Sequence, residues 1–390
     1  MMVIPANNGR SPATVALISK WRALIRRDDS VETELASPAE TSTEPGWWAD
    51  QWLPDRYLDG YETLAFHMPG QLLLPEEGDG YLTATLIRSE PDQRDRAVLY
   101  LHGWNEYFFQ DHVAQAWQRL GYDFYALDFH RYGRNLRSGQ LPGYAESVAD
   151  YFEEIDAAIA RLRQTHRYVV INAHSTGGLI ASLWANARPG QLVGLVLNAP
   201  WLDLSGSLLS RTLTQAASKA LAGKAATWEI PRSESDIYIH SLHQAFNGRW
   251  SFDLSLKRPL SSPIRPGWLN AIVRAQDQVR QGLAIDVPVL VVLSSQSTEP
   301  KQLDEPTVAT TDVIVDVDRV AAQTIRLGWH VSLVRLDGAV HDVALSDQPV
   351  RERYFDEIRR WDLAYTRGRQ AQQQALDAAD EGQTPAEGSN

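Results

Sequence analysis

The sequence predicts an α/β fold, in which a mostly parallel central sheet is covered by helices on both faces. From about residue 96 onward, short apolar runs alternate with amphipathic helical segments. The runs are apolar throughout, as in YVVIN at 168–172, which is typical of strands buried on both faces. Two earlier strand-like runs, 61–68 and 81–88, follow one another without a helix and predict an antiparallel edge.

The elements follow in order along the chain. The expected strands are 61–68, 81–88, 96–101, 124–127, 168–172, 192–197, 287–293 and 330–336. The expected helices are 111–120, 144–164, 178–187 and 350–365, with one more beginning near Asp316. The alternation stops between Trp201 and about Gly282, where the sequence is helical or irregular. An insertion there would lie above the carboxyl ends of the strands, where open α/β sheets bind ligands, so we interpret it as a cap.

The chain is predicted to consist of a core, a cap and two flanking segments. The core comprises residues 47–201 and 283–369, and the cap, 202–282, is inserted after the sixth strand. Residues 1–46 read as a basic amphipathic helix followed by an acidic linker, and 370–390 as a disordered tail. We expect the apolar face of the helix to pack on the protein's own body. Weak association with an anionic membrane surface is the alternative.

Composition excludes several classes of function. The net charge of −12 has the wrong sign for a protein that binds nucleic acid through its phosphates. The chain has no cysteine, which excludes disulfides, thiolate metal sites and a cysteine nucleophile. We expect a cytoplasmic protein without a metal, monomeric or weakly homo-oligomeric.

The stretch NAHSTGG at 172–178 carries the first chemical signal. It places Ser175 on a sharp turn from a buried strand into a helix, with small residues two positions before and after it. This is the pattern of the nucleophile elbow of α/β-hydrolases. Ala173 stands where glycine is usual, while Gly177 and Gly178 keep the helix side small. A turn with Ser175 as a mere helix cap is the alternative.

A second signal is LHGW at 101–104, directly after the expected third strand. Acyl transfer places negative charge on the former carbonyl oxygen, and two fixed backbone N–H groups can stabilise that charge. The expected pair of donors is Trp104 and Thr176, the residues that follow the glycine of this loop and the nucleophile.

The remaining partners should follow in the order acid, then histidine. His341 lies just beyond the last strand, in LDGAVHD at 336–342, and fits a general base. After strand 287–293 a long polar loop leads to TDVIVDVD at 311–318, which offers several aspartates. Asp312 is the expected acid because it precedes the next helix. Asp316 is the alternative, although it is also placed to cap that helix.

The cap contains many aromatic residues and cations. Trp201, Tyr238, Trp250 and Trp268 are candidates for an apolar acyl pocket, or they fill the core of the cap itself. The cations are expected either at a rim that faces a polar head group or at solvated surface positions. They are Arg211, Lys219, Lys224, Arg232, Arg249, Lys257, Arg258 and Arg265.

Taken together, these motifs resemble the α/β-hydrolases of the monoacylglycerol lipase, lysophospholipase and serine aminopeptidase type over about residues 81–369. HGWNEY is similar to that family's HGxxEH, and NAHSTGG to its GHSMGG. LDFHRYGRN is similar to DxRGHGxS, with Arg131 and Asn135 in place of the usual glycine and serine. TDVIVD stands for the acid loop and LDGAVHD for the histidine loop.

The resemblance implies a serine hydrolase that cleaves carboxylic esters through an acyl-serine intermediate, with no cofactor. It implies small-molecule acyl esters as substrates, and the aromatic cap favours short to medium acyl chains. The alternatives are an acyltransferase or an aminopeptidase that uses the same triad, or a non-catalytic hydrolase fold that binds a ligand.

Overall fold

The computed structural model describes residues 47–368, except for 79, 205–215, 218, 224, 231–236, 247 and 300–305. The predicted amino-terminal helix and linker at 1–46 and the predicted tail at 370–390 lie outside the described residues. Several stretches of the predicted cap also lie outside them. Within the described part, no helix is long and apolar enough to cross a membrane.

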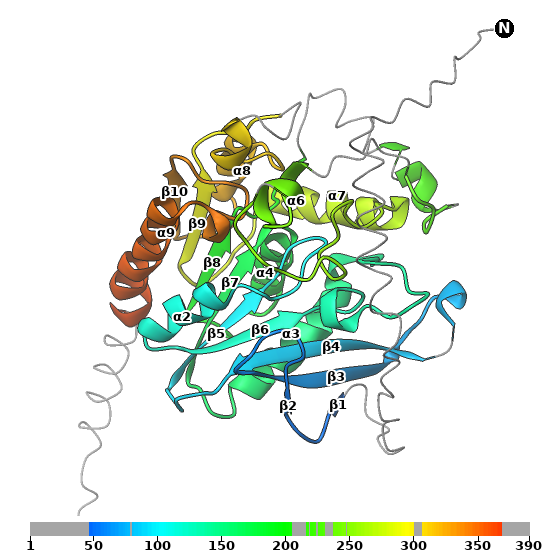
Figure 1. Cartoon of the computed structure of the whole chain (residues 1–390), viewed down its shortest axis with the longest axis horizontal. Coiled ribbons are helices and arrows are strands. Elements are labelled where there is room, and N and C mark those ends of the chain that lie inside the picture. The colour runs from blue at the N-terminus through cyan, green and yellow to red at the C-terminus, as the bar shows by residue number, and fades with distance from the viewer. Residues whose placement is uncertain are drawn as a thin grey trace, which may run out of the picture. The chain divides into compact units, whose positions relative to one another are not determined.

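A ten-stranded sheet forms the centre of the molecule (Figure 1). Its strands follow the order β1-β3-β4-β6-β5-β7-β8-β9-β10, and β2 pairs with β3. The six strands from β6 to β10 in this order run parallel, whereas β4 pairs antiparallel with both β6 and β3. The strand bounds are β1 Trp47–Trp48, β2 Leu53–Pro54, β3 Tyr61–Leu72, β4 Tyr81–Ser89, β5 Arg96–Leu101, β6 Asp123–Asp128, β7 Tyr168–His174, β8 Gly194–Asn198, β9 Val289–Ser294 and β10 Val331–Leu336.

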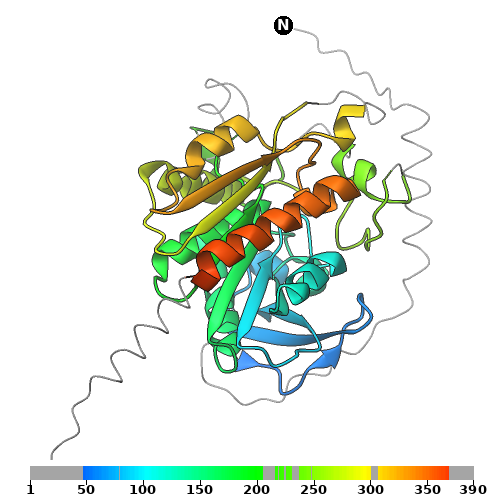
Figure 2. The same cartoon turned by 90° about the vertical axis from the view of Figure 1, so that its left-hand side faces the viewer.

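Helices cover both faces of the sheet, as the two views in Figures 1 and 2 show. One apolar cluster joins the sheet to α3 (Phe152–Leu162), α4 (Ser175–Ala187), α7 (Pro266–Gln281) and α8 (Val317–Thr324). A second cluster joins the other face to α2 (Asp111–Arg119) and α9 (Gln348–Trp361). The predicted α/β fold with an antiparallel edge is therefore confirmed.

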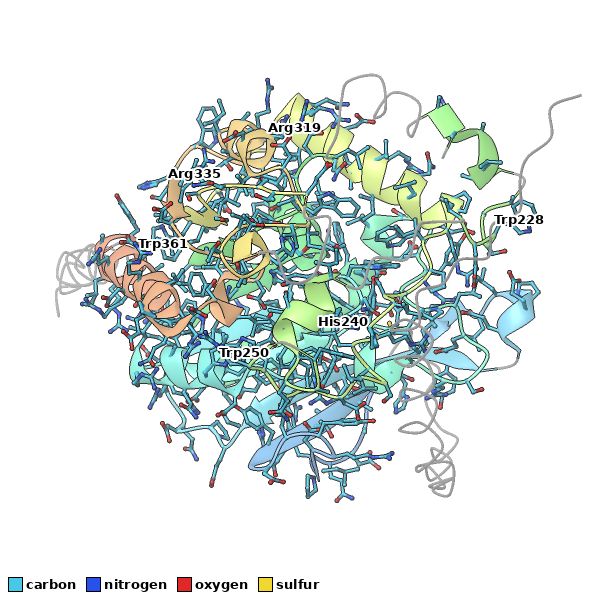
Figure 3. The ribbon with its side chains drawn as sticks, turned by 45° about the horizontal axis from the view of Figure 1, so that its top comes forward. Trp228, His240, Trp250, Arg319, Arg335 and Trp361 are labelled. Carbon is cyan, nitrogen blue, oxygen red and sulfur yellow. The ribbon has the colours of Figure 1, made fainter. Side chains whose placement is uncertain are left out.

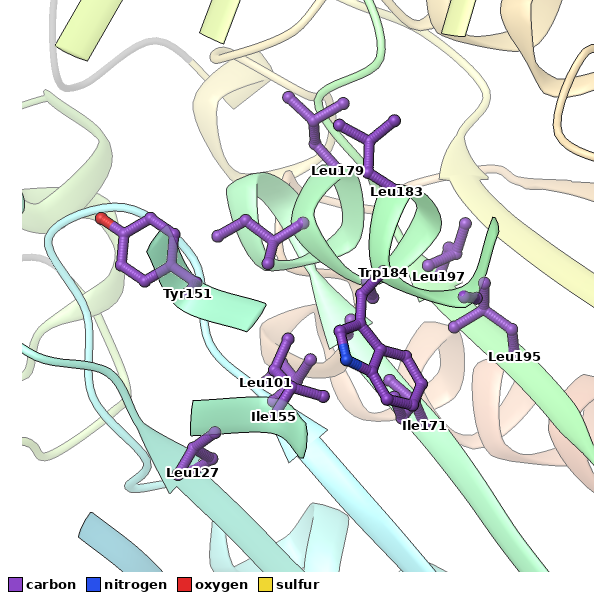
Figure 4. Packing of buried hydrophobic residues seen from close by; sticks show 14 of the residues in the cluster. Leu101, Leu127, Tyr151, Ile155, Ile171, Leu179, Leu183, Trp184, Leu195 and Leu197 are labelled. Carbon is purple, nitrogen blue, oxygen red and sulfur yellow. The ribbon is translucent and has the colours of Figure 1, made fainter. Parts of the chain in front are cut away.

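Helix α4 is buried along most of its length. Figure 4 shows Leu179, Leu183 and Trp184 of this helix with Ile171 and Leu195 of the strands that it covers. Of these five, only Leu183 exceeds 2% exposure, at 5%. Burial of this many large apolar side chains holds α4 rigidly against β7, which matters because Ser175 is the first residue of α4.

Some predicted bounds differ from those found. Helix α3 begins at Phe152, after a short 3₁₀ helix (η3, Val148–Tyr151), rather than at Tyr144. The physical reason is a capping box, because the Ser147 side chain accepts from the Ala149 N–H and Asp150 accepts from the Ser147 N–H. Helix α4 begins at Ser175, three residues earlier than expected, because the turn from β7 is immediate.

In the region predicted as a cap, the structure gives bounds for two helices, α6 and α7. Helix α6 (Ile237–Leu242) belongs to a small separate apolar cluster with Phe109, Phe252 and Leu345. Helix α7 lies in the predicted cap range but buries Trp268 and Ile272 in the main core cluster. By its packing, α7 is part of the layer that covers the sheet.

Because strands β5 to β10 are parallel, the loops that leave their carboxyl ends meet at one edge of the sheet. Four of these loops carry the residues predicted to form the site. The β5 loop is residues 102–110, the elbow is the β7–α4 turn at Ser175, the acid loop is residues 295–316, and the histidine loop is residues 337–347.

Candidate active site

Ser175 sits on a strained turn. Its backbone has φ +51°, a left-handed conformation that residues other than glycine seldom adopt. The helix side of the turn leaves no room for a side chain, because a Cβ on Gly177 would lie 2.3 Å from the His102 carbonyl oxygen. On Gly178 it would lie 2.7 Å from Pro200 Cβ. The small residues of the NAHSTGG stretch are therefore required by the close crossing of α4 over its neighbours.

A chain of two hydrogen bonds connects the three residues expected to form the triad. His341 Nε2 lies 2.9 Å from Ser175 Oγ, and His341 Nδ1 lies 2.8 Å from Asp312 Oδ2. A carboxylate can only accept, so the bond to Asp312 places the proton on Nδ1 and leaves Nε2 to accept from the serine. His341 and Asp312 are 3% and 0% exposed, so both bonds are shielded from water.

The acid loop separates its two candidate aspartates by their surroundings. The second oxygen of Asp312 accepts from the N–H groups of Ile314 and Val315, at 2.8 and 2.9 Å. Asp316 instead caps α8, where its side chain accepts from the Arg319 N–H at 3.2 Å and forms an ion pair with the Arg319 side chain. The geometry brings Asp312, and not Asp316, to the histidine.

The β5 loop lies directly against the elbow. A Cβ on Gly103 would be 3.0 Å from the His174 ring and 3.1 Å from Ser175 Cβ, so only glycine fits here without displacement. Among the described residues, the backbone N–H of Trp104 has no hydrogen-bond acceptor. Thr176 is in the first turn of α4, where N–H groups have no partner within the helix. One expected oxyanion donor thus follows Ser175 in the chain, and the other follows Gly103, which packs against Ser175.

Glu106, also in the β5 loop, belongs to a buried polar cluster that was not predicted from the sequence. One of its oxygens accepts from Lys257 Nζ at 2.6 Å, and the other accepts from the Gly103 N–H at 2.9 Å. Burial alone would raise the pKa of Glu106, but Lys257, His174 and the Gly103 N–H together lower it to about 2. The only sequence signal was the glutamate of the HGWNEY stretch.

Glu106, His174 and Asp342 lie close enough together to hold a cation, with one ligand atom from each within 4.8 Å of the others. The oxygens of the two carboxylates already accept hydrogen bonds from protein donors. Lys257 and Gly103 occupy Glu106, and Asp342 accepts from Asn198 at 2.7 Å, among other donors. Burial lowers the pKa of His174, whose Nδ1 lies 3.1 Å from the Asn198 carbonyl oxygen. We interpret this cluster as a structural network that supports the site.

Two of the predicted pocket residues, Trp201 and Trp268, form a tryptophan cluster with Trp104 beside Ser175. The Trp268 ring lies 3.9 Å from that of Trp104 and 5.9 Å from that of Trp201, measured between ring centroids. The Trp201 N–H donates to the Ser175 carbonyl oxygen at 3.0 Å. The indole of Trp104, which follows Gly103, therefore packs on a buried tryptophan of the core.

The other two predicted pocket residues have different surroundings. The Tyr238 ring lies edge-on to His341 at 5.8 Å, and its hydroxyl accepts from the N–H of the residue after His341. The Trp250 indole donates to the Leu345 carbonyl oxygen at 2.7 Å and stacks on His112. Figure 3 shows Trp250 with His240 of α6, well apart from Trp228, which is 73% exposed. Trp250 thus fastens its segment to the histidine loop.

Comparison with known protein families matches residues 92–298 to the family described as serine aminopeptidase S33. The matched range covers more than half of the chain. The chain belongs to this family. The range includes the β5 loop and the elbow and ends before Asp312 and His341. Membership makes the protein an α/β-hydrolase, as its sheet and helices indicate.

Individual relatives are more distant. Phospholipase YtpA of Bacillus subtilis (strain 168) is 29% identical over 115 residues, which are 29% of this chain and 43% of that protein. A monoacylglycerol lipase from Paleococcus ferrophilus is similar in structure, with a TM-score of 0.54 and 18% identity over 73% of this chain and 99% of its own.

A monoglyceride lipase from Saccharomyces cerevisiae, a soluble variant, has a TM-score of 0.53 and 16% identity over 75% of this chain and 96% of its own. At these identities the two structures show a shared fold.

Proposed function

We propose that the protein is a serine hydrolase of carboxylic esters, of the esterase and lipase kind. The observation that carries the proposal is the hydrogen-bonded chain from Ser175 through His341 to Asp312, on a turn that holds the serine at φ +51°. Relatives described as a phospholipase and as monoglyceride lipases agree with this class.

In the proposed mechanism, Ser175 Oγ attacks the ester carbonyl carbon while its proton passes to His341 Nε2. The carbonyl oxygen becomes an anion, which the N–H groups of Trp104 and Thr176 stabilise. The anion collapses, the alkoxide leaves with the proton from His341, and an acyl-serine remains. Water then attacks the acyl group while His341 takes its proton, and collapse of the second anion releases the carboxylic acid as His341 returns the proton to Ser175 Oγ. Asp312 fixes the tautomer of the histidine and stabilises its protonated form.

Esters are favoured over peptides with a free amino terminus. An aminopeptidase needs a negative group for the substrate ammonium, and a buried ammonium without a partner is costly. Among the described residues around the elbow, the carboxylates of Glu106 and Asp342 already have their partners. Beside Ser175, Trp104 and Trp201 are half-buried and keep apolar surface that suits an acyl chain, whereas Trp268 packs between them and the core.

A fluorophosphonate probe tests the nucleophile. The wild type is expected to be labelled at Ser175, and Ser175→Ala to lose both labelling and p-nitrophenyl butyrate hydrolysis by at least about 10⁴-fold, because nothing else supplies the attacking oxygen. Ser332→Ala is the matched control, since Ser332 lies at the amino end of β10, away from the edge of the sheet that carries Ser175, and it should retain labelling and activity. Labelling that persists in Ser175→Ala would remove this serine from the mechanism, and a wild type that is neither labelled nor active would favour a ligand-binding role.

Substrate class is tested with p-nitrophenyl esters of two to twelve carbons against amino-acyl p-nitroanilides. We expect kcat/KM to be highest for short to medium esters, after correction for the easier chemistry of esters. Faster cleavage of the anilides would favour an aminopeptidase, and faster transfer to an added alcohol than to water would favour an acyltransferase.

A further inference from the structure

A segment of the predicted cap, residues 253–262, binds the β5 loop through four polar contacts, of which one is the hydrogen bond from the Asp253 N–H to the Tyr107 hydroxyl at 2.7 Å. Lys257 Nζ lies 2.6 Å from Glu106 Oε1. The Asn105 side chain donates to the Arg258 carbonyl oxygen at 2.9 Å and accepts from the Ser262 hydroxyl at 3.1 Å. Asn105 has φ +53°, so these contacts hold a conformation that the chain would otherwise disfavour.

Both side chains of the ion pair between Lys257 and Glu106 are buried, at 3% and 1% exposure. The Lys257 ammonium also lies at nearly equal distances from three aromatic rings: 5.8 Å from Phe109, 5.9 Å from Phe252 and 6.0 Å from Tyr238. Removing one partner of such a pair leaves a charge without compensation in a medium of low dielectric constant. The pair therefore fixes the lysine and the glutamate together.

The position of Glu106 gives this pair a chemical consequence. The Glu106 oxygen that accepts from the Gly103 N–H would lie 3.2 Å from a Cβ on Gly103, and Ser175 Cβ would lie 3.1 Å from the same point. A carboxylate thus stands close behind the residue that precedes the expected oxyanion donor. Without a neutralising cation, its charge would repel the anion that forms on the substrate carbonyl oxygen.

We propose that Lys257 is a positioning residue for the oxyanion site: it neutralises Glu106 behind Gly103 and holds the β5 loop in the conformation that presents the Trp104 N–H. This inference rests on the proposed ester hydrolysis at Ser175. The 253–262 segment would then control the rate of the reaction although it supplies no reacting atom.

The test uses the full chain with p-nitrophenyl butyrate as substrate. Lys257→Met is expected to lower kcat by about 100-fold, as the loss of an oxyanion donor does, with KM changed by less than about threefold. Affinity for a trifluoromethyl ketone, which forms an oxyanion on the serine, should fall by about the same factor.

Adding Glu106→Gln to Lys257→Met should restore at least about tenfold in kcat, because the amide oxygen still accepts from Gly103 without a charge. Lys257→Arg should remain within about tenfold of the wild type because it keeps the cation. Arg249→Met is the matched control: it removes an ion pair with Asp347 whose side chains are 74% and 52% exposed, and should leave kcat unchanged.

A folded Lys257→Met with wild-type kcat and ketone affinity would overturn the inference while leaving the proposed function intact. So would a rate loss that Glu106→Gln does not relieve. If Lys257→Met does not fold, the double variant decides: kcat within tenfold of the wild type supports the inference, and any larger loss overturns it. A wild type without esterase activity or serine labelling would instead remove the proposed function, and the inference with it.

Discussion

The β5 loop and the loop after β6 (residues 129–147, the β6 loop) leave neighbouring parallel strands at the same edge of the sheet. Each contains a residue other than glycine in a left-handed conformation, Asn105 with φ +53° and Arg131 with φ +58°. Each also holds a buried ion pair to a distant segment. The β5 loop pairs Glu106 with Lys257, and the β6 loop pairs Arg131 with Glu77.

The two loops differ in what lies behind the charge. Glu106 stands next to Gly103 and the elbow, where we propose that an anion forms during the reaction. Arg131 is held by Glu77, from the 3₁₀ helix after β3, and by the Tyr144 carbonyl oxygen at 3.1 Å. The same kind of interaction should therefore control rate in the first loop and stability in the second.

The largest effect is expected in the acid loop, where Asp312 and Asp316 differ in the same way: the first should control rate and the second stability. Asp312→Asn should lower kcat by about 10⁴-fold while the fold remains intact, because an amide no longer fixes the tautomer of His341. Asp316→Asn should leave kcat within about twofold and lower the free energy of unfolding by at most about 1 kcal/mol, because asparagine also caps helices. Steady-state kinetics and urea unfolding measure both. The reverse ranking would transfer the role of acid to Asp316.

The next prediction applies to the β6 loop the substitution proposed for Lys257. Arg131→Met should lower the free energy of unfolding by about 3–5 kcal/mol, because it leaves Glu77 buried without its cation. In the folded fraction, kcat with p-nitrophenyl butyrate should stay within about threefold of the wild type. Urea unfolding and kinetics on the same preparation check this. A rate loss as large as that expected for Lys257→Met would show that the two loops are not distinct.

Much of the fold and of the candidate site was predictable because the signals are local. Apolar runs mark the buried strands, and Ser175 and His341 lie in short motifs at strand ends. Asp312 was distinguished from Asp316 by its position before a helix start, and the structure places only Asp312 against the histidine. Neighbouring residues in the chain carry all of this information.

What the sequence did not predict depends on long-range packing. Lys257 and Glu106 are 151 positions apart, and a cap lysine reads the same whether it faces solvent or a buried carboxylate. The pocket role of Trp250 stays a prediction from residue type, and the sequence did not indicate that its indole contacts the distant Leu345 and His112. Arg131, at the usual glycine, signalled a departure but not its partner Glu77.

The smallest effect is expected in acid and concerns stability alone. Burial would raise the pKa of Glu106, but Lys257, His174 and the Gly103 N–H lower it to about 2, from 4.5 in the unfolded chain. Below pH 4.5 the unfolded state therefore binds a proton that the folded state does not, so stability falls as the pH falls toward 2.

The Lys257→Met/Glu106→Gln variant lacks this carboxylate. Between pH 5 and pH 3, its free energy of unfolding should fall less steeply than that of the wild type, by up to about 1.4 kcal/mol per pH unit. The pKa of Glu77 is also lowered, since its hydrogen bonds from Arg131 and two backbone N–H groups outweigh burial, and Glu77→Gln should flatten the profile in the same direction. Urea unfolding at half-unit steps of pH measures these slopes. Equal slopes for wild type and double variant would mean that Glu106 is not held ionised in the fold, and the electrostatic part of the contrast between the loops would be lost.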